Sequence, residues 1–391
     1  MHNFDESISR RHYNALKWDD MYPHYGTNDI IPLWVADMDF KTAPPIIEAV
    51  KAQAEHGIYG YMHRKDSYFR AIAAWYESRH DWPVKEEWLV FSPGVMSSMN
   101  FLIETLSKPN DPVLIQQPVY SPFANKIREN GRKVLVNQLI KEKDSSYSID
   151  IEAFEQLIID NKPPLFILCN PHNPVGRVWT RSELTALGDI CLKHGVKVIS
   201  DEIHCDLVYK PYRHIPFGSI SEEFALNSVV LSAPSKTFNL AGLQTSFAIC
   251  PNESDRKRLA NSLAKVDLTL NNSFSLSATE VAYKKGEPWL EDLLVYLEHN
   301  INFVIGFFHE HFPNVKLAKP QGTYLLWIDF SSYGLNDDAL QEIMIKNAGV
   351  ALSRGDAFGK GGEGHMRMNV ACPKSTLEIA MNQIKKALDA L

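Results

Sequence analysis

The stretch "LSAPSKTFNLAGLQ", residues 231–244, places a lysine shortly after an apolar run. Residues 228–231, "SVVL", have the length and composition of a buried strand. The residues between that run and Lys236 are small or rigid, which does not favour a long helix. The pattern predicts that Lys236 stands just past the end of a core strand. Lysine is rarely buried without a partner, so this position suggests a functional role.

Similar apolar runs recur through the middle of the chain and alternate with helical patterns. One helix is marked by a capping box from Thr180 to Glu183 and by the terminating Gly195. Strands that alternate with helices indicate βαβ units, and so an α/β fold with a mostly parallel sheet covered on both faces. The runs expected to form strands are 112–118, 133–140, 164–171, 196–202, 228–235 and 246–250.

The C-terminal part has a different pattern, which predicts a smaller α/β domain. Strands are expected at 322–330 and 364–372, followed by a last helix with a second capping box at 375–378. One face of that helix carries Leu377, Met381, Ile384, Leu388 and Leu391. The pattern breaks near 284–289. We expect an N-terminal segment at 1–45 that packs with the small domain, a large domain at 46–285 and the small domain at 286–391.

Composition excludes several classes of protein. A length of 391 residues suggests about two domains, and a net charge of −7 without a basic block argues against nucleic acid as a partner. Five dispersed cysteines fit a reducing compartment and argue against a disulfide framework. The N-terminus lacks the apolar core of a secretory signal, and no apolar run is long enough to span a membrane. We expect a soluble, cytoplasmic protein.

Polar side chains follow several of the predicted strands. Tyr120, Asn173, Asp201 and Lys236 each come at or just after the end of a different run. Ligands of open α/β sheets bind beyond the carboxyl ends of the strands, so these four side chains are expected to share one crevice.

A desolvated lysine amine is a nucleophile toward an aldehyde, and pyridoxal 5′-phosphate is the common aldehyde cofactor. Asp201 could hold its ring nitrogen protonated, Asn173 could donate to its ring oxygen, and Tyr120 could stack on its face. The glycine of "SPGVMSSMN" (92–100) opens a predicted helix, whose N-terminus suits a phosphate.

Five motifs together resemble the MalY/PatB group of fold type I pyridoxal-phosphate enzymes, which are cystathionine or cysteine-S-conjugate β-lyases related to class I/II aminotransferases. They are "LWVADMDF" (33–40), "NPHNPVG" (170–176), "SDEIHCDLVY" (200–209), "APSKTFNLAGLQ" (233–244) and "RMNVACP" (367–373). The resemblance runs from about Arg11 to the C-terminus.

The resemblance implies a role for each candidate residue. Lys236 would be the catalytic lysine that holds the cofactor, and Arg367, with Ala36 nearby, would bind the substrate α-carboxylate. Tyr61 would reach the cofactor phosphate of the partner subunit, so a homodimer with shared sites is implied. The implied cofactor-binding residues are Tyr61, Gly94, Val95, Met96, Tyr120, Asn173, Asp201, His204, Ser235 and Lys236.

Three positions depart from the wider aminotransferase pattern. Gln244 stands where an arginine usually binds the phosphate, and Ala233 stands where a serine is common, with Ser235 as a possible substitute. His204 stands where many aminotransferases place a tyrosine on the ring oxygen.

Some of these residues also allow other interpretations. Asp201–Asp206 could supply metal ligands, but without a matched His/Cys cluster no metal is expected. Trp34 is interpreted as core packing. For function, the expectation is β-elimination from a sulfur amino acid that yields thiol, pyruvate and ammonia. The alternatives are an aminotransferase, which uses the same residues, and a lyase that also binds a regulatory protein such as a transcription factor.

Overall fold

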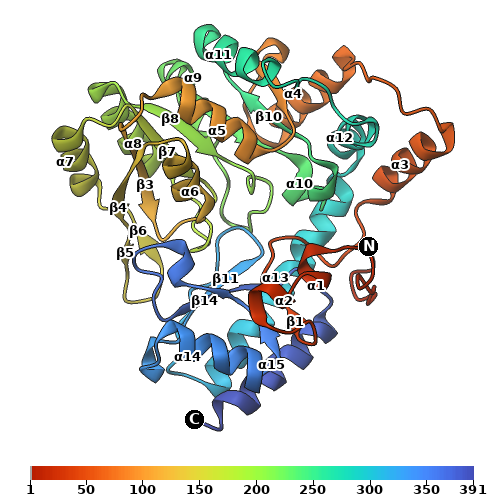
Figure 1. Ribbon diagram of the computed structural model, residues 1–391, viewed down its shortest axis with the longest axis vertical. Coiled ribbons are helices and arrows are strands. Elements are labelled where there is room, and N and C mark those ends of the chain that lie inside the picture. The colour runs from red at the N-terminus through yellow and green to blue at the C-terminus, as the bar shows by residue number, and fades with distance from the viewer. Residues whose placement is uncertain (1) are drawn as a thin grey trace.

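The computed structural model describes residues 2–391, and within them the main sheet has seven strands in the order β2-β10-β9-β8-β7-β3-β4 (Figure 1). All neighbouring pairs are parallel except those of β10, which is antiparallel to both β2 and β9. The strands are β2 (Leu89–Ser92), β3 (Pro112–Gln117), β4 (Lys133–Gln138), β7 (Leu165–Cys169), β8 (Lys197–Asp201), β9 (Ser228–Ser232) and β10 (Ser246–Ile249).

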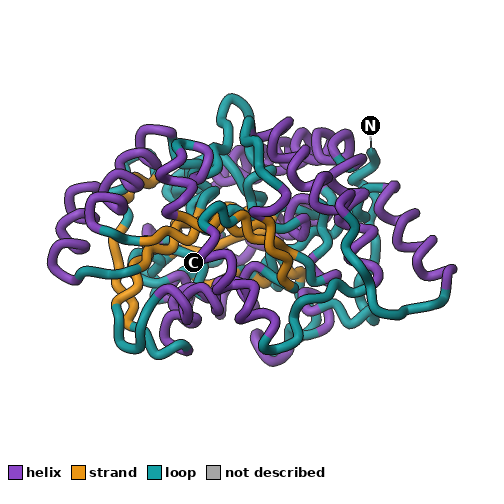
Figure 2. Tube along the Cα trace, turned by 90° about the horizontal axis from the view of Figure 1, so that it is seen from above, coloured by secondary structure: helices purple, strands orange, loops and turns teal. Residues whose placement is uncertain are grey.

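Helices lie on both sides of this sheet (Figure 2), which explains why its strands are continuously apolar. Every residue of β7 and β9 is buried. The surrounding helices are α4 (Asp66–His80), α5 (Val95–Leu106), α6 (Pro122–Glu129), α7 (Ile151–Asn161), α8 (Arg181–His194), α9 (Glu222–Asn227), α11 (Glu253–Ala264) and α12 (Ser273–Lys285). Helix α3 (Pro44–His56) lies farther out, against α12 (Figure 1).

A second, smaller sheet has the order β11-β14-β13 and packs with the C-terminal helices. Its strands are β11 (Leu325–Asp329), β13 (Ser353–Arg354) and β14 (His365–Asn369); the helices are α13 (Glu287–His311), α14 (Asp337–Glu342) and α15 (Lys374–Leu388).

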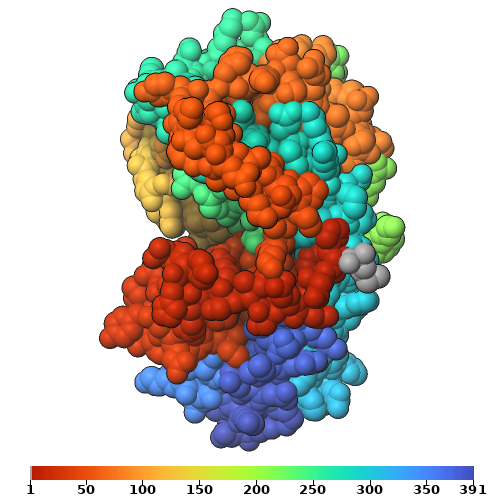
Figure 3. Space-filling model, turned by 90° about the vertical axis from the view of Figure 1, so that its right-hand side faces the viewer, coloured from red at the N-terminus to blue at the C-terminus, as the bar shows by residue number. Residues whose placement is uncertain are grey.

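The N-terminal segment lies against this smaller sheet region. Strand β1 (Ile31–Pro32) pairs in parallel with β12 (Val350–Ala351). The short helices α1 (Leu16–Asp19) and α2 (Tyr22–Tyr25) precede it, and Figure 3 shows these residues as a red band between the orange and green part of the chain and the blue C-terminal part. Elsewhere, β5 (Ile140–Lys141) and β6 (Tyr147–Ser148) form an antiparallel hairpin shortly after β4.

The predicted α/β architecture is confirmed, and each expected strand is present with its ends shortened. The capping box of α8 is also confirmed: Thr180 Oγ1 accepts from Glu183 N at 3.2 Å, and Glu183 Oε2 accepts from Thr180 N at 2.7 Å. Strand β2, at the edge of the main sheet, was not predicted.

The expected capping box at 375–378 is wrong. Helix α15 begins at Lys374 after Pro373, with no side-chain cap, so Ser375 already lies within the first turn. The predicted apolar face is buried except at Leu391, which is 62% exposed because the helix has ended at Leu388.

Gly286 separates α12 from α13 at the expected break. However, α13 packs in one cluster with Trp75 and Phe238 of the main-sheet part as well as with α15, so the three domain boundaries stay a prediction. Among residues 2–391, no helix combines the length and apolarity that a membrane span requires.

Candidate active site

A cavity of about 770 Å³ opens at the carboxyl ends of β7, β8 and β9. The N-terminal segment supplies Trp34, Val35 and Ala36 to its wall, and the small sheet region supplies Ser353 and Arg367. It brings together nearly all the predicted residues: Ala36, Gly94, Val95, Met96, Tyr120, Asn173, Asp201, His204, Ser235, Lys236 and Arg367.

Lys236 lies in α10 (Pro234–Thr237), a single turn that starts at a proline directly after β9. Its Nζ donates to the carbonyl oxygen of Ala36 at 2.6 Å. Burial lowers the pKa of this amine to about 8; the carboxylates of Asp37 and Asp201 oppose the shift, whereas Arg367 adds to it. About a tenth of the amine is therefore neutral, and nucleophilic or basic, at pH 7, far more than for a lysine of ordinary pKa.

Asp201 is the last residue of β8 and is buried. Among residues 2–391, the one hydrogen bond that its carboxylate receives comes from the Ile203 N–H at 3.1 Å. Burial raises its pKa to about 7, against the effects of that N–H and of Lys236. A cation or an N–H donor placed in the cavity would return this carboxylate to its charged form.

Arg367 comes from the middle of β14 and is buried beside Asn173. It donates to Asn173 Oδ1 at 3.0 Å, to the Trp34 carbonyl at 2.8 Å and to Ser353 Oγ at 3.2 Å. Its Nε has no acceptor among the described residues, and burial lowers its pKa to about 10. Since no carboxylate neutralises it within the described chain, the guanidinium is suited to an anionic ligand.

The Asn173 side chain uses its oxygen for Arg367, which leaves its amide nitrogen to donate elsewhere. Its backbone carbonyl accepts from the Tyr120 N–H at 3.0 Å, so the two residues are held together. Burial raises the pKa of Tyr120. Both residues line the cavity.

Helix α5 points its N-terminus at the cavity. Gly94 is the N-cap, with extended backbone, and Gly94 to Ser97 all line the wall. The first N–H groups of a helix have no intrahelical acceptor and attract anions. Ser235, Gln244 and Thr245 line the same cavity and offer further polar groups there.

His204 is buried, with its ring edge-on to Tyr324 at a centroid distance of 5.9 Å. Its Nδ1 has no hydrogen-bond partner among residues 2–391. Burial, with the charges of Lys236 and Arg367, holds its pKa well below the usual value, so the imidazole is neutral.

The positions of Tyr61 and Trp34 differ in part from what the sequence led us to expect. Tyr61 is 97% exposed and does not line the cavity, so this chain alone does not bring it to the site. Trp34 was interpreted as core packing, and its half-buried ring does pack against His24 and Tyr25, with centroid distances of 4.9 and 5.4 Å. The same residue also lines the cavity, and its carbonyl accepts from Arg367, which the interpretation did not include.

Sequence reasoning missed three residues. Tyr324 donates through Oη to the Ala36 carbonyl at 2.8 Å, Ser353 contacts Arg367, and the Phe358 ring lies 4.9 Å from the Arg367 guanidinium. The only signals in the sequence were the aromatic residue in "GTYLLWIDF" and the glycine-rich turn at 355–364, and neither indicates a partner.

The site fits pyridoxal phosphate on the properties of its own donors. The buried Asp201 carboxylate lacks a cationic hydrogen-bond partner among the described residues, the Lys236 amine has a lowered pKa, and a helix N-terminus stands at the same cavity. These are the groups that a pyridinium, an aldehyde and a phosphate require.

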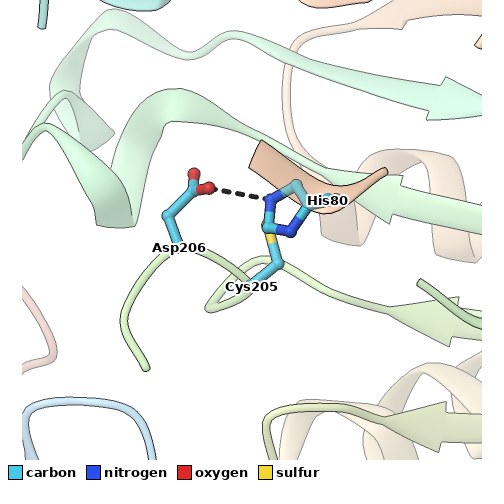
Figure 4. Close-up of side chains that lie close together, drawn as sticks. All are labelled: His80, Cys205 and Asp206. Atoms are coloured by element: carbon cyan, nitrogen blue, oxygen red, sulfur yellow. Dashed lines mark hydrogen bonds and ion pairs between the residues drawn. The ribbon is translucent and has the colours of Figure 1, made fainter. Parts of the chain in front are cut away.

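His80, Cys205 and Asp206 cluster away from this cavity, with the Asp206 carboxylate joined to His80 Nε2 at 2.9 Å (Figure 4). Asp206 also accepts from Trp75 Nε1 at 3.0 Å and from Thr237 Oγ1 at 2.8 Å. Because its oxygens are already occupied by donors, the cluster has the character of a hydrogen-bond network and not of a metal site.

Comparison with known proteins agrees with this geometry. The family model "Aminotransferase class I and II" matches residues 28–384. Cystathionine beta-lyase PatB of Bacillus subtilis is 45% identical over 386 residues, which cover 99% of this chain and 100% of that protein.

Two solved structures are also similar throughout. Cystalysin from Treponema denticola, which contains pyridoxal 5′-phosphate, has a TM-score of 0.96 and 35% identity, with 100% of this chain and 99% of that chain covered. The PLP-bound C-S lyase from Staphylococcus hominis has a TM-score of 0.93 and 34% identity, with 99% and 98% covered. The chain belongs to the class I and II aminotransferase family of pyridoxal-phosphate folds.

Proposed function

We propose that this protein is a pyridoxal-phosphate-dependent carbon–sulfur β-lyase that converts L-cystathionine or a cysteine S-conjugate into a thiol, pyruvate and ammonia. The observation that carries the proposal is the meeting of a buried amine of lowered pKa, an unneutralised buried carboxylate and an unneutralised buried guanidinium in one cavity. The full-length identity to a cystathionine β-lyase favours elimination as the outcome.

When bound, pyridoxal phosphate withdraws electrons from the substrate Cα and so makes its proton acidic. Lys236 would hold the cofactor at rest and, when freed, take the Cα proton. A pKa of about 8 gives the amine the basicity that this transfer needs near neutral pH.

Two other side chains orient the reactants. Arg367 would bind the substrate α-carboxylate through two N–H groups, with its plane fixed by Ser353 and Phe358. Asp201 would accept a hydrogen bond from the ring nitrogen, which restores the charge that burial disfavours. The N–H groups of Val95 and Met96, with Ser235, would bind the phosphate.

The proposed assembly is a cytoplasmic homodimer with shared sites. Ile58, Tyr59, Tyr61, Val266 and Leu270 are large apolar or aromatic side chains that are exposed in the single chain. Tyr59 also packs against Phe274 of α12, with ring centroids 5.6 Å apart. A second copy covering this surface would bury it and bring its own Tyr61 toward the cofactor phosphate. A regulatory protein partner stays a prediction.

An aminotransferase is the second candidate, because the family match covers nearly the whole chain and the same residues serve both reactions. The test is turnover without a keto acid. Purified protein given L-cystathionine should release homocysteine, pyruvate and ammonia over many turnovers. If release stops after one turnover and resumes only when a keto acid is added, the protein is an aminotransferase.

A further inference from the structure

The carbonyl oxygen of Ala36 accepts two side-chain hydrogen bonds at the wall of the cavity. It accepts from Lys236 Nζ at 2.6 Å and from Tyr324 Oη at 2.8 Å. The Ala36 carbonyl therefore holds the free amine of Lys236 at a defined point, as long as the loop that contains Ala36 is itself fixed.

One side of this loop is held by four charged residues, Arg10, Lys17, Asp37 and Asp39, which form the N-terminal ion cluster. Arg10 binds both oxygens of Asp37 at 2.9 and 2.7 Å and also Asp39 at 2.8 Å. Lys17, which is fully buried, binds Asp39 at 2.7 Å. Burial acts to raise the pKa of Asp39, but Lys17, Trp18 and Arg10 lower it overall, so this buried carboxylate is held in its charged form.

The other side of the loop is tied to the turn that carries the lysine. Asn239, three residues after Lys236, donates to the carbonyls of Met38 at 2.9 Å and Phe40 at 3.0 Å and accepts from the Met38 N–H at 3.0 Å. Its φ of 56° lies in the left-handed region, which asparagine tolerates better than most residues. The side-chain hydrogen bonds of Asn239 therefore fix the position of the turn that carries Lys236 relative to the loop that carries its acceptor, Ala36.

We propose that the N-terminal ion cluster and Asn239 form a clamp that positions the Ala36 carbonyl as the acceptor for the free Lys236 amine, which makes Asn239 and Asp37 positioning residues of the reaction. The clamp holds the amine in place while it is not bonded to cofactor, and it fixes the Asp37 carboxylate one residue after the carbonyl that accepts from the amine. The charged or titratable groups that act on this amine are Asp37, Asp201 and Arg367, with neutral His204 and Tyr324 beside them.

The positioning arm of the test uses Asn239→Gly, because glycine keeps the backbone conformation and removes only the side chain. In the cofactor-loaded full chain, kcat for pyruvate release should fall about tenfold while KM changes much less, since misplacing a reacting group lowers turnover. The control is Lys41→Met, which breaks an exposed ion pair with Glu6 on the same loop and should leave kcat unchanged. If Asn239→Gly changes only KM, or no more than the control does, the positioning role is refuted.

A second experiment tests the role of Asp37 without measuring turnover. It can therefore fail or succeed independently of the proposed function, on which the measurement of kcat rests. Lys236 of the full chain without cofactor is labelled with an amine-reactive reagent across pH, and its peptide is quantified by mass spectrometry. Asp37→Asn should shift the half-labelling point of Lys236 to lower pH, because an anion that favours the ammonium is gone. Glu6→Gln is the matched control and should not shift it. Coincident curves for the two variants would overturn the role of Asp37.

Discussion

Asp201 and Asp206 are five residues apart in the sequence and both are buried, yet their surroundings are opposite. Asp201 receives one backbone N–H, and burial raises its pKa to about 7. Burial also acts to raise the pKa of Asp206, but the donors from His80, Arg79 and Thr237 outweigh it and lower that pKa to about 2.

This difference separates a functional carboxylate from a structural one. Asp206 has all its partners within the chain and ties together α4, the turn after β8 and α10. Asp201, like Lys236 and Arg367, is buried without an oppositely charged hydrogen-bond partner in the described part of the chain. Groups of this kind destabilise the protein alone and acquire their partners from a ligand.

The largest expected effect on activity comes from replacing Lys236, which, like Asp201, has no oppositely charged hydrogen-bond partner in the described chain. Lys236→Ala should reduce pyruvate release by about 10⁴-fold, since both the covalent attachment and the base are lost. Thermal stability without cofactor should not fall, because a desolvated amine is removed. A variant that still forms a borohydride-reducible link between protein and cofactor would refute the assignment.

The comparison is tested directly by replacing each aspartate with asparagine. Asp201→Asn should slow exchange of the substrate Cα proton with solvent deuterium by about a hundredfold, because the ring nitrogen of the cofactor would lose its carboxylate partner. Asp206→Asn should instead lower the free energy of unfolding by about 3 kcal/mol, since buried donors lose a charged acceptor. Exchange near the wild-type rate for Asp201→Asn, or equal effects of both changes on stability, would contradict the distinction.

A smaller effect is expected at Arg367, where the change preserves charge but not geometry. Arg367→Lys should lower kcat/KM for amino-acid substrates about 10- to 100-fold, because hydrogen bonds to charged groups contribute about 1.5–3 kcal/mol. Cofactor content, measured by absorbance, should be kept. Decarboxylated amine analogues serve as the control, and an equal loss with them would show that Arg367 does not bind the carboxylate.

The smallest effect is a pH dependence of stability with opposite signs at the two aspartates. The folded-state pKa of Asp201 is raised, so the folded protein without cofactor binds the extra proton and its stability falls as pH rises from about 4 to about 7. The pKa of Asp206 is lowered, so its contribution is present above about 4 and is lost as pH falls toward 2. Denaturant titrations should show that the decrease in stability between pH 4 and 7 that Asp201 contributes is missing in Asp201→Asn. An unchanged slope there would mean that Asp201 is not protonated in the empty site.

The sequence was informative where chemistry is local. Runs of apolar residues predicted the buried strands, and the polar residues at their ends predicted Asn173, Asp201 and Lys236, because parallel strands deliver their ends to one edge. The Ala36 region and Arg367 were expected only through resemblance to a family.

What could not be predicted depends on contacts between distant segments. Arg367 and Trp34 are 333 positions apart, and Tyr324 and Ala36 are 288 apart. Nothing local in "GTYLLWIDF" distinguishes an active-site tyrosine from a core one, and nothing in "PLWVAD" shows that Trp34 is also part of the cavity wall. The same limit applies to Asp206, whose donors come from α4 and α10.

The pairing of Ile31–Pro32 with Val350–Ala351 has a consequence for the order in which the molecule is made. The wall of the cavity needs residues 34–36 at one end of the synthesis and Arg367 at the other. The emerging chain can form the main sheet early, from contacts of moderate sequence separation, but the N-terminal segment must wait for its partner strand. We therefore expect competence to bind substrate to arise late in folding, after the main sheet has formed, so that an incomplete chain has no finished site.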